Sequence, residues 1–282
     1  MRALVGSITK YNLRWFIATV PLAKGPAEKV DSTLYAQPAI FVTSLAALEV
    51  YKTNHPDKLK NVKTAAGFSL GEYTALCFGG GITFTECLKL VQVRAEAMFA
   101  ATQEAASGMA SIVGITDDAV LEKCLREARA AVGGDGDAYI ANYMFPGGRT
   151  CSGDKQVLSK ACELAKEAGA SSAKLLAVSG AFHTPYMKSA AARLAVALDE
   201  APLRMPSIDV ISNVTAEPYG SVDEIRSLLK RQMLEPVKWE QTIRSLLDGH
   251  SEYLEPGPGK QLKAMLRRID QKAWGLTEVI EK

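Results

Sequence analysis

The segment GFSLGEY, residues 67–73, places a serine between two glycines. Ser69 stands in a G-x-S-x-G pattern, with Gly67 before it and Gly71 after it. Between a strand and a helix, this pattern is typical of a sharp turn that exposes a nucleophilic serine at the carboxyl end of a parallel sheet. The N–H of Leu70 at the helix start would then stabilise a developing oxyanion. Structural turns also show the pattern, so the serine needs a partner before it indicates catalysis.

A general base for the serine has few candidates, because the chain contains 3 histidines. His183, in VSGAFHTPYM, lies between a predicted strand and a predicted helix, at the same end of the sheet as the serine turn. A helix-capping or surface role is the alternative for this residue. His55 and His250 lie in polar, turn-like segments and are poorer candidates. No acidic residue stands out as the third member of a triad, so a backbone carbonyl is the expected partner of the histidine.

An arginine on an apolar helix face is the third candidate. Arg94 lies at helical spacing from four apolar residues, Cys87, Leu90, Val91 and Met98. A guanidinium directed toward a core needs a partner. It can bind a substrate carboxylate through two parallel hydrogen bonds. A structural ion pair, or a side chain that reaches back to water, is the alternative.

The predicted elements indicate an α/β protein with a small inserted lobe. Within residues 107–173 the strand and helix patterns follow the order β-α-β-β-α-β, which is the ferredoxin-like arrangement. The remaining residues, 1–106 and 174–282, are expected to form the larger core. The core is predicted to contain helices over 36–54, 72–78, 84–106, 185–200, 221–234 and 239–249, strands over 61–68 and 208–215, and a strand, a glycine turn and a final helix after residue 250.

The segment EPGPGK, residues 255–260, resembles a phosphate-binding loop only superficially. That loop has the pattern G-x-x-x-x-G-K-[ST], whereas here Leu254 takes the place of the first glycine and Gln261 follows the lysine. We therefore expect a turn between a strand and a helix.

Composition narrows the possible functions. The chain has 282 residues, 48% of them hydrophobic, which is enough for one sizeable core or for a core and a small lobe. A net charge of +2 does not favour a nucleic-acid partner, and no apolar run reaches the roughly 18 residues of a membrane helix. The 5 cysteines are scattered without a CxxC pair, so we expect no metal site and a reduced compartment.

The amino terminus is basic. Four basic residues and no acidic residue occur in the first 27 positions: Arg2, Lys10, Arg14 and Lys24. The segment is either the remnant of an organelle transit peptide or a short or truncated amino terminus, and the second interpretation is preferred.

Seven segments recur in one protein family in the order and spacing found here. They are GFSLGEYTAL, LVQVRAEAM, ANYMFPGG, VSGAFHTPYM, VISNVTAEP, RQMLEPVKWEQTI and YLEPGPGKQL. On these segments the chain resembles the malonyl-CoA:acyl carrier protein transacylases of fatty-acid synthesis, from about residue 25 to its end. The resemblance implies an α/β-hydrolase-like core with a parallel sheet and an inserted ferredoxin-like subdomain. It looks closest to the plant and algal plastid type, in which an apolar residue such as Phe68 precedes the serine, where bacterial members carry histidine.

The resemblance implies a ping-pong acyl transfer. Ser69 would attack the malonyl thioester with His183 as general base, and hold the malonyl group as an ester while CoA leaves. The phosphopantetheine thiol of acyl carrier protein would then take the group, and no cofactor is needed. Arg94 matches the family arginine that holds the malonyl carboxylate, and Gln232 matches the position whose backbone carbonyl orients the histidine. Leu70 would supply its N–H to the oxyanion hole.

Two further positions match site residues of the family. Asn142 matches an asparagine that lines the site, and Phe182 belongs to the Ala-Phe-His pattern associated with malonyl rather than methylmalonyl units. The family also begins with a strand and a G-Q-G-x-Q loop whose first glutamine contributes to the oxyanion hole, and that motif does not occur in this sequence. We therefore expect an incomplete sequence, with a divergent, weak enzyme as the alternative.

Two other functions stay open. A serine esterase or thioesterase would use water as acceptor, which the inward-facing Arg94 and the lack of a third acid disfavour. An inactive truncated relic of the transferase is suggested by the missing glutamine loop.

The expected partners are malonyl-CoA and acyl carrier protein, with no nucleic acid and no membrane, and the chain is expected to be a monomer. The expected compartment is the plastid stroma or mitochondrial matrix of a eukaryote, or the cytoplasm of a bacterium.

Acyl carrier proteins are acidic, so a basic surface can steer them toward the enzyme. Basic residues gather in the predicted last helix: Lys260, Lys263, Arg267, Arg268 and Lys272. Lys188 and Lys238 lie near the site motifs and form a second candidate surface. A solvated helix face without a partner is the alternative for both.

Overall fold

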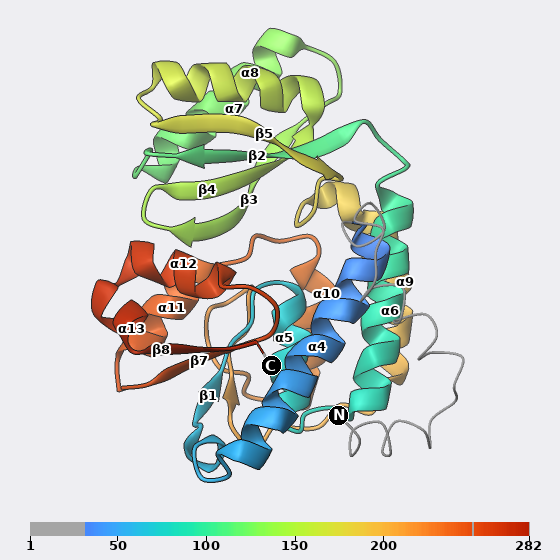
Figure 1. Ribbon diagram of the computed structural model, residues 1–282. Coiled ribbons are helices and arrows are strands. Elements are labelled where there is room, and N and C mark those ends of the chain that lie inside the picture. Colours follow the sequence, from blue (N-terminus) through green and yellow to red (C-terminus); the bar gives the residue numbers. More distant parts are fainter. Residues whose placement is uncertain (1–31, 250, 282) are drawn as a thin grey trace.

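The computed structural model describes residues 32–249 and 251–281. A four-stranded antiparallel sheet with two covering helices lies above a larger core of helices and short parallel strand pairs (Figure 1). The basic segment at the amino terminus and His250 lie outside the described residues.

The first part of the core contains three α-helices, a 3₁₀ turn and a short strand. They are α4 (Thr33–Asn54), the 3₁₀ turn η1 (Leu59–Asn61), β1 (Thr64–Ala65), α5 (Leu70–Phe78) and α6 (Phe84–Ala101). Thr83 and Thr85 are both possible caps by residue type, and the structure uses Thr83, whose side chain accepts a hydrogen bond from the N–H of Glu86. The predicted helix over 84–106 ends earlier, at Ala101.

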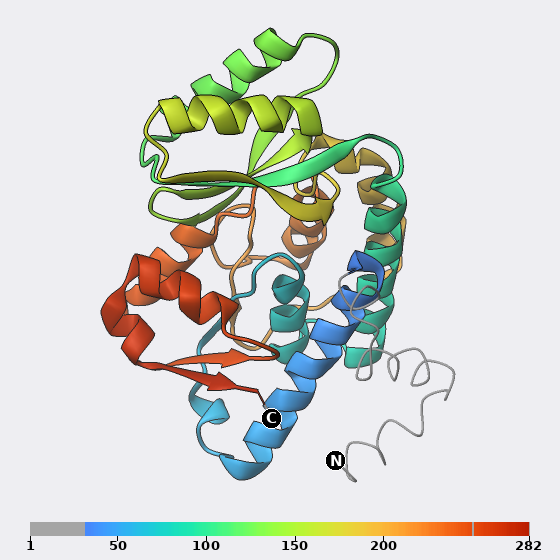
Figure 2. The same ribbon diagram turned by 45° about the horizontal axis from the view of Figure 1, so that its top comes forward.

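Helix α4 runs alongside α6 in both ribbon views (Figures 1 and 2). Among the described residues it is the helix whose length and composition would allow it to cross a membrane, although core helices pass the same test. Its apolar side chains Phe41, Ala47 and Leu48 are buried in the protein's own hydrophobic clusters. Packing within this fold therefore accounts for part of the apolar composition of α4, whereas Tyr35 and Ile40 on the same helix are exposed.

The small sheet has the predicted βαββαβ order. Its elements are β2 (Ser107–Val113), α7 (Asp118–Val132), β3 (Ala138–Phe145), β4 (Gly148–Asp154), α8 (Lys155–Glu167) and β5 (Ser172–Ser179). The strands pair antiparallel in the order β3-β4-β2-β5, and both helices cover one face (Figure 1). This confirms the ferredoxin-like arrangement. The division into a lobe at 107–173 and a core stays a prediction, and β5 itself continues to Ser179.

The second part of the core follows the sheet. Its elements are η2 (Pro185–Met187), α9 (Lys188–Glu200), β6 (Asp209–Val210), α10 (Val222–Gln232), α11 (Trp239–Leu247), β7 (Tyr253–Pro256), α12 (Gln261–Ile269), α13 (Gln271–Gly275) and β8 (Thr277–Ile280). Strand β1 pairs parallel with β6, and β7 pairs parallel with β8. The strands predicted over 61–68 and 208–215 are much shorter in the structure, and β8 was not predicted. The predicted last helix is divided, because Asp270 ends α12 and caps α13 through the N–H of Ala273.

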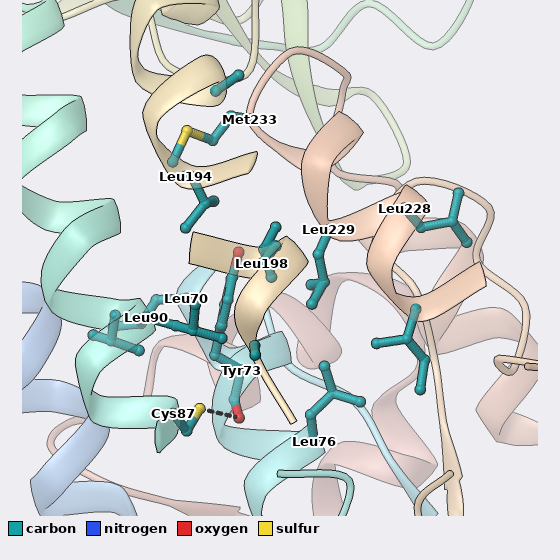
Figure 3. Packing of buried hydrophobic residues seen from close by; sticks show 14 of the residues in the cluster. Leu70, Tyr73, Leu76, Cys87, Leu90, Leu194, Leu198, Leu228, Leu229 and Met233 are labelled. Carbon is teal, nitrogen blue, oxygen red and sulfur yellow. Dashed lines mark hydrogen bonds between the residues drawn. The ribbon is translucent and has the colours of Figure 1, made fainter. Parts of the chain in front are cut away.

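Helix α5 is enclosed by its neighbours. In Figure 3, Leu70, Tyr73 and Leu76 of α5 pack among leucines of α6, α9 and α10. The Cys87 thiol of α6 also donates a hydrogen bond to the backbone carbonyl of Tyr73, at 3.4 Å. Because the helix is held on several sides, the serine turn at its amino end has a fixed position.

The sheet is joined to the core beside α10. The N–H of Tyr143 in β3 donates to the carbonyl of Val237 at 2.9 Å, and the N–H of Val237 donates to the carbonyl of Ala141 at 2.9 Å. Arg149 of β4 is buried and forms an ion pair with Glu240 of α11 at 2.9 Å. The edge of the sheet thus lies against the segment that follows Gln232.

Candidate active site

The turn between β1 and α5 holds Ser69 in an uncommon backbone conformation, with φ of 50° and ψ of −99°. A Cβ atom at Gly67 would lie 1.9 Å from the carbonyl carbon of Gly71, so only glycine fits there. A Cβ atom at Gly71 would meet nothing within 4 Å. The first glycine of G-x-S-x-G is therefore required by close packing, whereas the second is not.

Asn213, which lies just after β6, stabilises this turn through two side-chain hydrogen bonds. Its side-chain oxygen accepts the N–H of Ser69 at 2.7 Å, and its side-chain nitrogen donates to the carbonyl of Gly67 at 2.7 Å. The side chain is fully buried. Sequence reasoning missed this residue, and the available signal was an amide within the apolar predicted strand IDVISNVT.

Ser69 and His183 form the predicted pair. The Ser69 Oγ lies 2.8 Å from His183 Nε2, and His183 Nδ1 lies 2.8 Å from the backbone carbonyl of Gln232. Because a carbonyl only accepts, Nδ1 carries the proton and Nε2 is free to accept the serine hydroxyl proton. Burial, together with the positive charge of Arg94, lowers the pKa of His183 to about 4. The imidazole is therefore neutral at neutral pH, the state that a general base requires.

Arg94 is almost fully buried, with 1% of its surface exposed. Its Nη2 donates to Ser69 Oγ at 2.9 Å and to the side-chain oxygen of Gln232 at 3.1 Å, while Nη1 donates to the side-chain oxygen of Gln37 at 2.5 Å. Nε has no hydrogen-bond partner, and no described carboxylate forms an ion pair with the guanidinium. A buried cation with neutral partners and an unused donor is suited to bind an anionic ligand. Burial lowers the pKa of Arg94, while the charge of Glu72 opposes that shift.

Gln232 contributes more than its predicted backbone carbonyl. Its side-chain nitrogen donates to the carbonyl of Ser69 at 2.9 Å and to Glu72 Oε2 at 2.7 Å. Glu72, three residues after the serine, is fully buried and also accepts a hydrogen bond from the hydroxyl of Tyr219. Sequence reasoning missed Glu72 and the amide of Gln232. The signal for Glu72 was a carboxylate inside the apolar helix segment LGEYTALCF.

The remaining predicted residues are placed as follows. No described group accepts the N–H of Leu70 at the start of α5, so it is available to a ligand. Phe182 is half-buried and packs against the main core cluster next to His183. Asn142 is buried in β3, where its amide donates to the hydroxyl of Thr150, and it makes no hydrogen bond to Ser69 or His183. The structure thus brings together Ser69, Leu70, Arg94, His183 and Gln232, whereas Asn142 bonds elsewhere.

Phe68 is held by the carboxyl-terminal helices. Its ring meets that of Trp239 edge-on, with centroids 5.7 Å apart. Both rings belong to a hydrophobic cluster that includes Leu266 of α12. The apolar residue before the serine therefore anchors the turn to α11 and α12.

Groups of three or more histidine, cysteine or acidic side chains able to hold a metal ion do not occur within residues 32–249 and 251–281. The residues gathered around Ser69 are a nucleophile, a base and hydrogen-bond donors. They can perform acyl transfer from their own side chains and backbone groups.

Comparison with known proteins gives consistent matches. Residues 15–268 match the family described as acyl transferase domain. The chain is 38% identical over 258 residues to the human mitochondrial malonyl-CoA-acyl carrier protein transacylase, covering 89% of this chain and 66% of that protein. It is 40% identical over 258 residues to a Drosophila melanogaster protein described as a probable mitochondrial enzyme of that name, covering 89% of this chain and 68% of that protein. The chain thus spans about two thirds of the length of these relatives.

Solved structures agree in fold. The acyl-carrier-protein S-malonyltransferase of Burkholderia pseudomallei superposes with a TM-score of 0.86 at 33% identity, covering 94% of this chain and 83% of that one. A malonyl-transacylase solved in complex with its type II PKS acyl-carrier protein superposes with a TM-score of 0.83 at 31% identity, covering 93% and 81%. These neighbours share the mixed α/β core with a parallel sheet and a small antiparallel subdomain.

Proposed function

Because the chain belongs to the acyl transferase domain family, we propose that it transfers the malonyl group from malonyl-CoA to the phosphopantetheine thiol of acyl carrier protein. This reaction supplies malonyl units to fatty-acid synthesis. The observation that carries the proposal is one hydroxyl, Ser69 Oγ, bonded both to a neutral imidazole and to a buried guanidinium. The imidazole supports nucleophilic attack, and the guanidinium supports the choice of an acyl group that ends in a carboxylate.

In the first half-reaction Ser69 Oγ attacks the thioester carbonyl while His183 Nε2 takes the hydroxyl proton. The carbonyl oxygen becomes negatively charged, and the Leu70 N–H donates a hydrogen bond to it. Collapse of this intermediate breaks the carbon–sulfur bond, and the imidazolium returns its proton to the leaving sulfur. The products are malonyl-Ser69 and free CoA.

The second half-reaction reverses these steps with a different thiol. His183 accepts the proton of the phosphopantetheine thiol, whose sulfur attacks the ester carbonyl of malonyl-Ser69. The carbon–oxygen bond then breaks, and the imidazolium protonates Ser69 Oγ. Throughout, the backbone carbonyl of Gln232 holds Nδ1–H, which keeps Nε2 directed at the serine.

Acyl-enzyme labelling tests the proposal. Incubation with radiolabelled malonyl-CoA should label the protein on Ser69, and Ser69→Ala should remove the label. Equal labelling of the Ser69→Ala variant would contradict the assignment of the nucleophile.

Adding holo acyl carrier protein to labelled enzyme should move the label to the carrier. Rapid release of free malonate without any carrier would favour an esterase instead. Absence of labelling in the wild-type protein would favour an inactive relic.

The proposal also covers the partners and the compartment. We expect the enzyme to act as a monomer without a cofactor, with malonyl-CoA and acyl carrier protein as its partners and with no nucleic acid or membrane. The compartment would be the mitochondrial matrix or plastid stroma in a eukaryote and the cytoplasm in a bacterium. Light scattering of the purified protein, alone and mixed with carrier, tests the oligomeric state.

A further inference from the structure

A buried carboxylate beside the site has no part in the transfer steps. Glu72 lies on α5, one turn after Ser69, and none of its surface is exposed. Burial raises the pKa of Glu72, while hydrogen bonds from Tyr219 and Gln232 and the charge of Arg94 oppose that shift. Burying an ionisable side chain costs folding free energy, so its presence in this position indicates a specific role.

The contacts of Glu72 lead to Arg94 through a single side chain. Glu72 Oε2 accepts from the Gln232 amide nitrogen at 2.7 Å, and the amide oxygen of Gln232 accepts from Arg94 Nη2 at 3.1 Å. The other carboxylate oxygen accepts from the Tyr219 hydroxyl.

An amide side chain has one donor end and one acceptor end, so its orientation depends on its neighbours. The nitrogen of Gln232 faces two acceptors, Glu72 Oε2 and the Ser69 carbonyl. Its oxygen therefore faces the guanidinium, which only donates. Rotating the amide by half a turn would set its oxygen against the Glu72 carboxylate and its nitrogen against the guanidinium, so both of its present hydrogen bonds to these groups would be lost.

We infer that Glu72 is a positioning residue: it fixes the amide orientation of Gln232 and, through that amide, the placement of the Arg94 guanidinium that receives the substrate carboxylate. The inference rests on the proposed malonyl transfer. Oε2 accepts from Gln232 whether or not the carboxyl group is ionised, because a proton on the other oxygen can be donated in a hydrogen bond to the Tyr219 hydroxyl oxygen. The acceptor atom, and not the negative charge, does the positioning.

Two substitutions separate these features. Glu72→Leu fills a similar volume but removes the acceptor, so Gln232 and Arg94 lose their fixed arrangement. The ratio of malonyl-CoA to acetyl-CoA kcat/KM should fall about tenfold, the effect of one hydrogen bond. Glu72→Gln keeps a carbonyl oxygen for Gln232 and can donate to Tyr219, so its ratio should stay within about threefold of wild type.

The selectivity ratio distinguishes positioning from a purely structural role, because partial unfolding lowers both activities equally. An unchanged malonyl-to-acetyl ratio in Glu72→Leu would overturn the inference. A tenfold loss of the ratio in Glu72→Gln would also overturn it, because that result would show that the negative charge, and not the acceptor atom, is what matters. Glu163→Gln, a matched change at an exposed carboxylate of α8, is the control. If wild-type protein fails to transfer malonyl at all, the proposed function fails instead.

A double-mutant cycle tests the route through Gln232. Gln232→Leu removes the amide but keeps the backbone carbonyl that holds His183. On this background Glu72→Leu should lower the malonyl-to-acetyl ratio no further. A second tenfold loss would show that Glu72 acts by another path and would overturn the inference.

Discussion

The Ser69 hydroxyl forms hydrogen bonds with two neighbours: it donates one to His183 and accepts one from Arg94. The two contacts have separate consequences for the chemistry. In the proposed reaction, the imidazole contact would serve any acyl group, whereas the guanidinium contact would matter for acyl groups that carry a carboxylate. Single substitutions can therefore separate rate from selectivity.

Replacing Arg94 by alanine should remove selectivity for malonyl. We expect malonyl transfer to fall about 10²-fold, because one partner of a buried, charge-assisted hydrogen-bonded pair is lost. Acetyl transfer should persist or rise, since no carboxylate needs the guanidinium. Paired kcat/KM measurements with both thioesters check this. Arg193→Ala, at an exposed position on α9, is the control, and equal losses of both activities would contradict the carboxylate role.

The lowered pKa of His183 predicts an unusual pH profile. With a pKa of about 4, the base stays neutral in mildly acidic solution, so acylation of Ser69 should stay nearly constant from pH 7 down to about pH 5. An ordinary histidine would lose activity below about pH 6.5. Initial rates of malonyl-enzyme formation between pH 4 and 8 measure the profile, and a midpoint near 6.5 would contradict it.

The same shift affects stability with a definite sign. The unfolded chain binds a proton at His183 near pH 6.5, whereas the folded protein does so only near 4. Between these values the unfolded state holds more protons, so the free energy of unfolding should fall by about 1.4 kcal/mol per pH unit from this group as pH decreases. Urea unfolding of wild type and His183→Gln across this range should differ by that slope, and parallel curves would contradict it.

At the scale of elements, the serine turn depends on one close approach. Gly67→Ala would force a Cβ atom to 1.9 Å from the Gly71 backbone, so it should destabilise the fold by about 1–3 kcal/mol or more. Gly71→Ala is the matched control, because its Cβ meets open space within α5. That change should leave stability unaltered or raise it by up to about 1 kcal/mol. Thermal unfolding of both variants distinguishes them, and equal effects would contradict the packing argument.

Sequence periodicity predicted the elements whose residues repeat at regular spacing. The βαββαβ order and the inward face of α6 bearing Arg94 both follow from such repeats, and both are confirmed. The short strands β1 and β6 were predicted too long, because the adjoining apolar residues serve the serine turn and its Asn213 clamp instead of strand pairing. Regular spacing carries no information about such contacts.

Long-range partners explain what sequence reasoning missed in the site. Glu72 forms a hydrogen bond with Gln232, which is 160 positions away in the sequence, and Asn213 forms one with Ser69, which is 144 positions away. A single sequence shows that a residue is polar on a buried face, but not which distant group satisfies it. The resemblance to a family identified Gln232 through its carbonyl, whereas its side-chain amide needed the structure.

At the scale of the whole molecule, a basic surface marks the carboxyl-terminal end. Lys260 precedes α12, Lys272 lies in α13, and the side chains of Lys263 and Arg267 lie over the ring of Trp274 at 5.7 and 5.0 Å. Lys260, Lys263, Arg267 and Trp274 line a hollow in the surface, whereas Lys272 is not part of its lining. Their fixed geometry on an aromatic ring makes this surface a better candidate for steering an acidic carrier than a freely solvated helix face.

Charge reversal tests this steering. Arg267→Glu should lower kcat/KM for the carrier several-fold at low salt, and the difference from wild type should shrink as ionic strength rises. Acylation of Ser69 by malonyl-CoA should be unaffected. Lys188→Glu, on the alternative surface, provides the comparison. Transfer rates that do not depend on salt would rule out electrostatic steering.

The bond from Arg94 to Ser69 has a consequence for the order of events. In the resting protein this bond occupies a lone pair of the nucleophilic oxygen. In the proposed reaction, an arriving carboxylate would compete for the same guanidinium donors, so docking of the malonyl group would itself release the Ser69 oxygen for attack. Electrophiles without a carboxylate would not displace this bond, so the proposed reaction implies a less reactive Ser69 hydroxyl in the unoccupied protein.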